Sequence, residues 1–161
     1  MSDHDGVREK TLVLIKPDAI QRGLIGEIIT RFEKKGLKIV GFKMMGLDEA
    51  VLREHYAHLK DKPFFPNLAK FMQSTPVIAL CIEGLQVVDA VRKITGITKA
   101  RDAEAGSIRG DFAMSVSCNV IHASDSRENA EIEVKRFFKV DELHDYNKSE
   151  YMHVYAEDEL K

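Results

Sequence analysis

Short apolar runs rich in β-branched residues mark the strands of this chain. Runs of this kind, bounded by turn residues, are typical of strands buried within a sheet. Within the second run, Val40, Phe42 and Met44 alternate with other residues and should share one face. The expected strands are residues 11–15, 37–47, 77–82 and 120–121.

Apolar residues at spacings of three and four predict helices between these strands. Asp48 should cap the helix that follows it, and Gly36 and Gly96 should end the helices that precede them. For the last long helix, Asp125 is the expected cap, with Glu128 as its partner three residues later. The expected helices carry their apolar stripes at 24–32, 52–59, 68–72, 87–94 and 130–138.

The order of these elements predicts the fold class. It is β-α-β, a helical insert, β-α, a long loop at 97–118, and β-α. Two βαβ halves around one sheet indicate a ferredoxin-like βαββαβ sandwich of the α/β (α+β) class. Its four-stranded sheet should be mainly antiparallel and covered by helices. We expect a single domain over 1–161, with a loose N-terminal tail at 1–9 and a C-terminal tail at 141–161.

Composition narrows the class of protein. A chain of 161 residues is long enough for a substantial core, and its net charge of −2 gives no reason to expect nucleic acid or a membrane as partner. The N-terminus lacks the apolar segment of a signal peptide, and no apolar run is long enough to span a bilayer. Cys81 and Cys118 should be buried free thiols. We expect a cytoplasmic protein.

One histidine stands where chemistry is possible. His122 follows an apolar run and precedes small polar residues, an arrangement that suits a core histidine as well as a reactive one. The chain has no glycine-rich phosphate-binding motif, so side chains would have to hold any nucleotide phosphates. The candidate side chains are Lys16, Arg92, Thr98 and Arg109, although each alone can be a solvated surface group.

A reactive histidine needs an orienting partner on its second ring nitrogen. At about 100° per residue, Glu128 falls on the solvent side of the last helix, whereas Glu131 and Glu133 flank its apolar stripe. Either of these two could reach His122, and helical geometry leaves the choice open.

Six motifs, in order, resemble the nucleoside diphosphate kinase family. The most specific is the run from Asn119 to Asp125, which is similar to the active-site signature N-x-x-H-[GA]-S-D. The resemblance extends from about Lys10 to Tyr155. The other five motifs are Ile15-Lys16-Pro17-Asp18, Gln21-Arg22-Gly23-Leu24-Ile25-Gly26, Glu54-His55-Tyr56, Lys62-Pro63-Phe64-Phe65 and Ile108-Arg109-Gly110-Asp111-Phe112.

The resemblance implies a nucleoside diphosphate kinase activity. The γ-phosphate of a nucleoside triphosphate, typically ATP, would pass to a nucleoside diphosphate through a phosphohistidine on His122, at the Nδ1 (pros) nitrogen. This ping-pong reaction would maintain NTP and dNTP pools with little base selectivity. Mg²⁺ would be held mainly by phosphate oxygens, and we expect no metal site built from protein side chains alone. A homo-oligomer is implied, with a hexamer ahead of a tetramer.

The resemblance also implies residue roles. Glu133, assisted by Ser124, would orient His122, and Tyr56 would lie beside Lys16 and the histidine. The implied nucleotide-binding residues are Lys16 and Asn119 at the sugar hydroxyls and nearby phosphate oxygens, Arg92, Thr98 and Arg109 at the terminal phosphates, Phe64 on the base, and Leu68 and Val116 around it.

Two alternative functions remain open at this point. Gly23-Leu24-Ile25-Gly26 resembles the GXXG loop of an RNA-binding KH domain. A catalytically silent interaction protein could also keep the fold. The acidic net charge argues against the first alternative, and the intact set of motifs argues against the second. Ala100 and Ala105 replace prolines that are usual in the family, and His153 replaces a tryptophan, which bears on loop stability and assembly.

Overall fold

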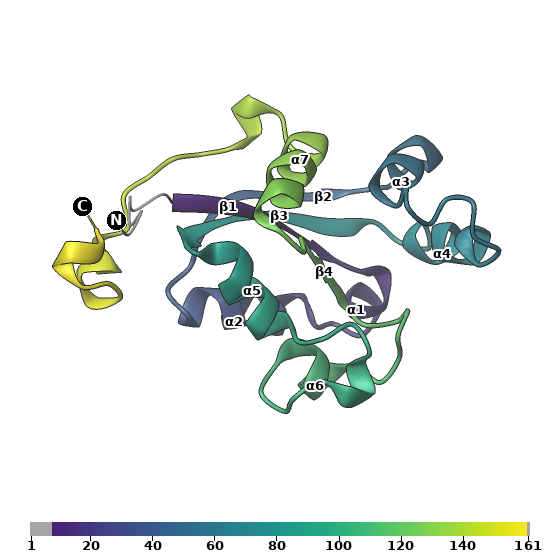
Figure 1. Ribbon diagram of the computed structural model, residues 1–161, viewed down its shortest axis with the longest axis horizontal. Coiled ribbons are helices and arrows are strands. Elements are labelled where there is room, and N and C mark those ends of the chain that lie inside the picture. The colour runs from purple at the N-terminus through teal and green to yellow at the C-terminus, as the bar shows by residue number, and fades with distance from the viewer. Residues whose placement is uncertain (1–7, 161) are drawn as a thin grey trace.

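Residues 8–160 of the computed structural model form an α+β sandwich around one sheet (Figure 1). Within this range, four strands pair in the order β2-β3-β1-β4, and every pairing is antiparallel. The predicted ferredoxin-like architecture is confirmed. The strands are β1 (Arg8–Ile15), β2 (Lys38–Met45), β3 (Val77–Leu85) and β4 (Ile121–Ala123).

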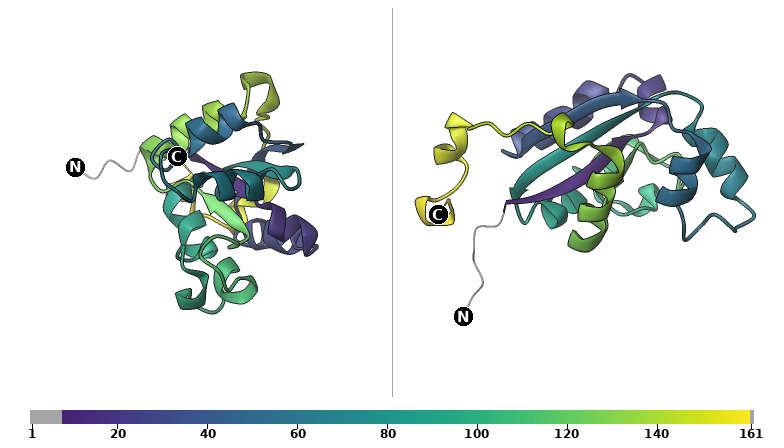
Figure 2. Two further views of the ribbon diagram at one scale, coloured as in Figure 1. Left: turned by 90° about the vertical axis from the view of Figure 1, so that its right-hand side faces the viewer. Right: turned by 90° about the horizontal axis from the view of Figure 1, so that it is seen from above.

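Helices cover both faces of the sheet (Figures 1 and 2). One face packs against α2 and α5, and the other packs against α7, with α3 and α4 beyond one end of the sheet. Among the described helices, none has the length and apolar character needed to cross a membrane. The α-helices are α1 (Pro17–Gln21), α2 (Ile25–Lys34), α3 (Glu49–His55), α4 (Phe65–Met72), α5 (Val87–Thr95), α6 (Ile108–Phe112) and α7 (Arg127–Phe137).

Strand β1 lies at the centre of the core. Val13 and Ile15 pack on the side of α2 and α5, whereas Leu12 and Leu14 pack on the side of α7. Alternate residues of a strand point to opposite faces, so a strand covered on both faces is apolar at every position. This explains why its sequence shows a continuous apolar run instead of an alternating pattern.

The helix caps confirm one prediction and correct another. Asp48 caps α3 as expected. The cap of α7 is Ser126, whose hydroxyl accepts the backbone N–H of Asn129 at 3.1 Å. The prediction of Asp125 with Glu128 is wrong by one residue, because the side chain of Asp125 instead accepts from the Asn129 amide.

The segment 97–118, predicted as a loop, contains a short 3₁₀-helix at Ala100–Asp102 and helix α6. Ser107 caps α6 with its hydroxyl. Arg31 of α2 then fastens the segment by donating to the Gly106 carbonyl and by pairing with Asp111 at 2.6 Å. Because Asp111 pairs with Arg31, Arg109 is left for other contacts.

The N-terminal prediction is corrected at its end. Residues 8 and 9 were expected in a loose tail, but they begin β1 and pair with β3. Residues 1–7 of that predicted tail lie outside the described residues.

The two cysteines differ in exposure. Both are free thiols in the described chain, as predicted. Cys81 is buried in β3, but Cys118 is exposed, so the prediction of two buried thiols is wrong for Cys118. Its apolar-looking neighbourhood in the sequence belongs to the loop that leads into β4.

Strand β2 forms an edge of the sheet and carries exposed apolar side chains. Its register with β3 shifts between Ile39 and Gly41. Val40 is buried, whereas Phe42 is 54% exposed and Met44 is 58% exposed. The prediction that Val40, Phe42 and Met44 share one face is wrong for Val40, which lies at the register shift and packs on the side of α7. Phe42 and Met44 pair with Leu80 and Ile78 on the side of α2 and α5 and remain exposed.

The C-terminal tail folds back along the sheet and ends near the start of β1 (Figure 1). It contains short 3₁₀-helices at Val140–Glu142, Ser149–His153 and Glu157–Glu159. Asp145 of this tail accepts a 2.6 Å contact from the buried Lys38 ammonium, which also pairs with Glu83 at 3.3 Å.

Candidate active site

His122 is the middle residue of β4. Its neighbours Ile121 and Ala123 are buried on the side of α5, so the imidazole points to the side of α7. The side chain is 21% exposed, and strand pairing with Leu14 of β1 fixes its backbone. A rigid strand thus presents a partly open imidazole.

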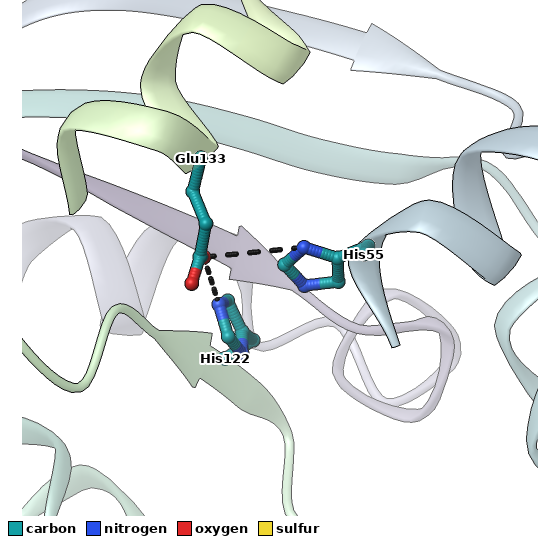
Figure 3. A group of neighbouring side chains, drawn as sticks. All are labelled: His55, His122 and Glu133. Carbon is teal, nitrogen blue, oxygen red and sulfur yellow. Dashed lines mark hydrogen bonds and ion pairs between the residues drawn. The ribbon is translucent and has the colours of Figure 1, made fainter. Parts of the chain in front are cut away.

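A carboxylate from α7 fixes the tautomer of this imidazole (Figure 3). Glu133 Oε2 lies 2.6 Å from His122 Nε2, and the Ser124 hydroxyl donates to the same oxygen at 3.3 Å. An ionised carboxylate only accepts, so Nε2 carries the proton and Nδ1 keeps its lone pair. Of the two glutamates that helical geometry left open, Glu133 makes this contact, and Glu131 is exposed.

A second histidine completes the cluster drawn in Figure 3. His55, the last residue of α3, places Nδ1 4.0 Å from Glu133 Oε2 and its ring centroid 4.5 Å from that of His122. Burial, together with the nearby His122 and Arg136, lowers the pKa of His55 to about 2. This ring is therefore neutral near neutral pH.

Lys16 and Asn119 form a buried pair beside strand β4. The Lys16 ammonium donates to Asn119 Oδ1 at 2.7 Å, while Asn119 Nδ2 donates to the carbonyls of Thr98 and Val116. Burial lowers the pKa of Lys16 to about 8, and the nearby Arg109 lowers it too. Asn119 thus orients the Lys16 ammonium and connects the segments that contain Lys16, Thr98 and Val116.

Arg109 is buried at the start of α6 and ties the site together. Its guanidinium donates to the carbonyls of Gly96, Asn119 and Ile121, at 3.0, 3.3 and 2.6 Å. Burial lowers its pKa to about 10, and the neighbouring Arg92 acts in the same direction. Arginine has five N–H donors, so two remain for a ligand after these three contacts.

The backbone before β4 is strained. Val120 has φ of +63°, a left-handed conformation that a β-branched residue rarely adopts. Two contacts hold it there: Asp18 Oδ2 accepts the Val120 N–H at 3.0 Å, and the Val120 carbonyl accepts the Lys16 N–H at 2.9 Å. Lys16 and the start of β4 are therefore fixed to each other through the backbone.

Comparison with known proteins decides the family. A family model described as "Nucleoside diphosphate kinase" matches residues 9–143. The chain belongs to the nucleoside diphosphate kinase family. The kinase of Parabacteroides distasonis is 56% identical over 152 residues, covering 94% of this chain and 99% of the relative. Nucleoside diphosphate kinase A of Homo sapiens is 52% identical over 138 residues, covering 86% and 91%.

Solved structures agree with this assignment. A halophilic nucleoside diphosphate kinase from Halobacterium salinarum, in complex with CDP, superposes with a TM-score of 0.89 at 46% identity. The match covers 92% of this chain and 99% of that one. The predicted family and its nucleotide-binding phosphotransferase activity are confirmed.

The remaining residues implied by likeness to nucleoside diphosphate kinases differ in burial. Tyr56 is buried next to His55, and burial raises its pKa. Phe64 is half exposed at the start of α4, where Leu68 is partly buried. The other exposed members are Arg92 on α5, Thr98, and Val116 in the loop before β4.

Three contributors to this nucleoside diphosphate kinase site were missed or misplaced by reasoning from the sequence. Asp18 and His55 lie inside quoted motifs, but their neighbours in space come from distant segments. The motif Glu54-His55-Tyr56 does not show that His55 lies against Glu133 and His122. Gly110 also lies inside a quoted motif, and a Cβ there would meet the Glu104 carbonyl oxygen at 1.9 Å. The close approach at Gly110 is to the chain itself.

Proposed function

We propose that His122 carries the phosphoryl group between nucleotides on Nδ1. The supporting observation is the 2.6 Å contact of Nε2 with Glu133, which leaves the Nδ1 lone pair free. In the first half-reaction, Nδ1 forms a bond to the γ-phosphorus while the bond to the β–γ bridging oxygen breaks. In the second, a terminal oxygen of a new diphosphate attacks that phosphorus and the P–N bond breaks. Glu133 stabilises the positive charge on the phosphorylated ring, with Ser124 holding the carboxylate.

The cations around the strand would bind the phosphates. Lys16 and Arg109 are buried and pre-oriented by Asn119 and by backbone carbonyls, so they lose little freedom when a phosphate binds. Arg92 and Thr98 are exposed, with Arg92 near Arg109 and the Thr98 carbonyl bonded to Asn119, and they would contact the terminal phosphates. Lys16 and Asn119 would also contact the sugar hydroxyls. Positioning and charge neutralisation are the main needs of phosphoryl transfer.

The base would contact a less selective surface. Phe64 is 50% exposed, and an exposed ring can stack on any base because every base has a π-face. Leu68 and Val116 would line the base on its other sides. The CDP bound by the relative from Halobacterium salinarum supports a nucleoside diphosphate as ligand. This arrangement supports maintenance of NTP and dNTP pools with little base preference.

The residues present fit Mg²⁺ that arrives with the nucleotide. The buried groups that would contact the phosphates are the cations Lys16 and Arg109, and the Glu133 carboxylate is already bonded to His122. Such a site cannot form a cage of oxygen ligands, whereas phosphate oxygens can supply them. Bound Mg²⁺ would neutralise charge on the transferring phosphate.

Labelled phosphate tests the proposed intermediate. The protein is incubated with Mg²⁺ and ATP labelled on the γ-phosphate, without an acceptor, and is then chased with unlabelled UDP. We expect acid-labile, base-stable label on the protein that moves to UTP. His122→Ala should carry no label, whereas His58→Ala, at an exposed histidine, should match the unmodified protein. Label that persists in His122→Ala would refute the assignment of the nucleophile.

We further propose a cytoplasmic homo-oligomer in which residues 1–161 form one domain. The exposed Phe42 and Met44 on the edge strand β2 support self-association, since apolar surface of this kind favours burial. A hexamer is expected ahead of a tetramer, and sedimentation velocity measures it directly. The free thiols Cys81 and Cys118 fit a reducing compartment.

A further inference from the structure

His55 is the member of the cluster in Figure 3 to which the proposed reaction gives no role. Its side chain is only 1% exposed. The ring is wedged between those of His122, Tyr56 and Phe137, with centroids at 4.5, 4.7 and 5.1 Å. All three contacts are edge-on, with interplanar angles between 72° and 89°. An apolar side chain could fill this buried space without the cost of removing a polar ring from water, so the presence of a histidine needs another explanation.

The tautomer of His55 is set by a charged group on α7. Arg136 Nη1 lies 3.2 Å from His55 Nδ1, and arginine only donates, so Nδ1 accepts and Nε2 carries the proton. Glu54 pairs with Arg136 at 3.1 Å and holds the guanidinium in place. Glu133 and Arg136 are three residues apart and therefore lie on one face of α7. One helix thus sets the tautomers of both histidines.

Two other roles for His55 conflict with its surroundings. A proton-transfer role would require an imidazole that titrates in the working range, and burial beside Arg136 and His122 prevents this. A metal-ligand role is suggested by donor atoms of His55, His122 and Glu133 that lie within 4.8 Å of one another. However, Arg136 occupies Nδ1 and Lys16 lies close enough to lower the same pKa, so a divalent cation would meet two positive charges.

The remaining role is mechanical, because the imidazole of His122 can turn about its last side-chain bond. That torsion is broad and roughly two-fold in free side chains. Glu133 restrains one nitrogen of the His122 ring. A single hydrogen bond still lets the plane of the ring tilt about the line that joins the two bonded atoms. The T-shaped packing of His55 against His122 supplies a second contact, and His55 Nδ1, 4.0 Å from Glu133 Oε2, also limits the movement of that carboxylate.

We infer that His55 is a positioning residue for the nucleophile: its neutral ring fixes the plane of the His122 imidazole, keeps Glu133 on Nε2, and leaves Nδ1 alone facing the phosphate. The inference rests on the proposed role of His122. A residue in this position acts on the reaction through another side chain, so its removal should affect the chemical step rather than nucleotide binding.

Substitution of His55 separates this role from simple packing. In His55→Leu the ring edge is lost, and kcat should fall about 10- to 100-fold with an unchanged KM, as expected for a misplaced reacting group. Phosphorylation by phosphoramidate, a small donor without a nucleotide, should slow by the same factor. Phosphorus NMR of the phosphorylated variant should show part of the phosphate on Nε2 of His122. His55→Phe keeps a ring and should restore most of the rate.

The matched control is His58→Leu, an exposed histidine one turn away. It should leave kcat, KM and the phosphohistidine isomer as in the unmodified protein. A His55→Leu variant that behaves like this control, or that raises KM without lowering kcat, would overturn the inference. If the unmodified protein itself takes no phosphate on His122, the proposed function has failed instead.

A measurement on the unmodified protein covers the case in which His55→Leu does not fold. Nitrogen NMR of ¹⁵N-histidine-labelled protein should show His55 neutral, with the proton on Nε2, from pH 5 to pH 9. A His55 ring that titrates in this range, or that carries its proton on Nδ1, would contradict the assigned contacts and the inference with them.

Discussion

Lys16 illustrates how a single side chain can be poised for a charged ligand. It is 8% exposed, and its ammonium has Asn119 as a neutral partner in place of water. Burial disfavours the charged form and lowers the pKa from 10.5 to about 8. A phosphate beside it would favour the charged form again. In the free protein the charged form of Lys16 is therefore disfavoured, and a bound phosphate would stabilise it.

Proton uptake on binding should reveal this effect. Near pH 9, Lys16 is mostly neutral in the free protein, and a bound nucleoside diphosphate should raise its pKa and draw in a proton. Titration calorimetry in two buffers with different ionisation enthalpies measures the uptake. Lys16→Met should abolish the contribution, whereas Lys43→Met on β2 should keep it. Equal uptake by Lys16→Met and the unmodified protein would contradict the assignment.

The same shift has a defined effect on stability. The folded pKa of Lys16 lies below the unfolded value, so between pH 8 and 10.5 the unfolded chain binds more protons. The contribution of Lys16 to the free energy of unfolding therefore rises with pH through this window. Below pH 8, Lys16 is charged in both states, and the full free-energy cost of burying its ammonium lowers the stability of the fold.

Helix α7 determines much of the site, because it places Glu133 against His122 and Arg136 against His55. The start of this helix is therefore coupled to the geometry of the candidate site. Ser126 satisfies the Asn129 N–H there, and the strand that precedes it is only three residues long.

Removing the cap should weaken the protein measurably. Ser126→Ala should lower the free energy of unfolding by about 1 kcal/mol, because an N–H at the helix start loses its acceptor. Glu128→Gln, at the position that the sequence alone assigned to the capping box, should change it by less than about 0.5 kcal/mol. Urea unfolding of both variants gives the comparison. A larger loss in Glu128→Gln than in Ser126→Ala would favour the cap expected from sequence.

Local patterns predicted the fold better than they predicted contacts. Apolar runs and helical spacing located every strand of the described chain and the long helices. Burial on one or two faces requires apolar residues at regular positions, and these positions can be read from the sequence. They missed α1 and α6, which are both short, and α6 is held by Arg31 from another helix. They placed the α7 cap at Asp125 because two adjacent residues, Asp125 and Ser126, can both cap a helix, and only backbone geometry selects one.

The candidate site divides in the same way. Motifs located His122 and the cationic side chains, since these lie in recognisable runs. The choice of Glu133 needed the packing of α7 on the sheet, or a family resemblance. The neighbourhood of His55 could not be derived, because it arises where the end of α3 meets α7. The exposure of Cys118 was misjudged because the residues before β4 look strand-like without pairing.

The C-terminal tail acts as a strap along the edge of the sheet. His144 donates its N–H to the carbonyl of Val40, where the β2 register shifts, and Tyr146 donates to the Ile39 carbonyl. Lys38 lies under the strap, with no exposed surface, between Glu83 and Asp145. A buried charge with two carboxylate partners thus connects the tail to the sheet.

Breaking this connection should be costly. Lys38→Met removes the contact with Asp145 and the closest of three cations around Glu83, leaving Lys10 at 3.4 Å and Arg8 at 3.9 Å. It should lower the free energy of unfolding by about 2 kcal/mol, as for hydrogen bonds to charged groups. Lys43→Met removes a half-exposed pair with Glu142 from the same strand and should cost less than about 1 kcal/mol. Urea unfolding measures both, and limited proteolysis should cut the tail of Lys38→Met faster. Similar decreases in the free energy of unfolding of the two variants would show that the burial of Lys38 does not make its ion pairs more stabilising.

The unequal exposure of the two thiols makes the site accessible to spectroscopy without any cysteine mutagenesis. Burial raises the pKa of Cys81 to about 12, so it offers almost no thiolate, whereas Cys118 is exposed. A maleimide fluorophore should attach to the folded chain at Cys118 alone. That position adjoins Asn119, which contacts Lys16, so the emission of the dye can follow nucleotides as they enter and leave.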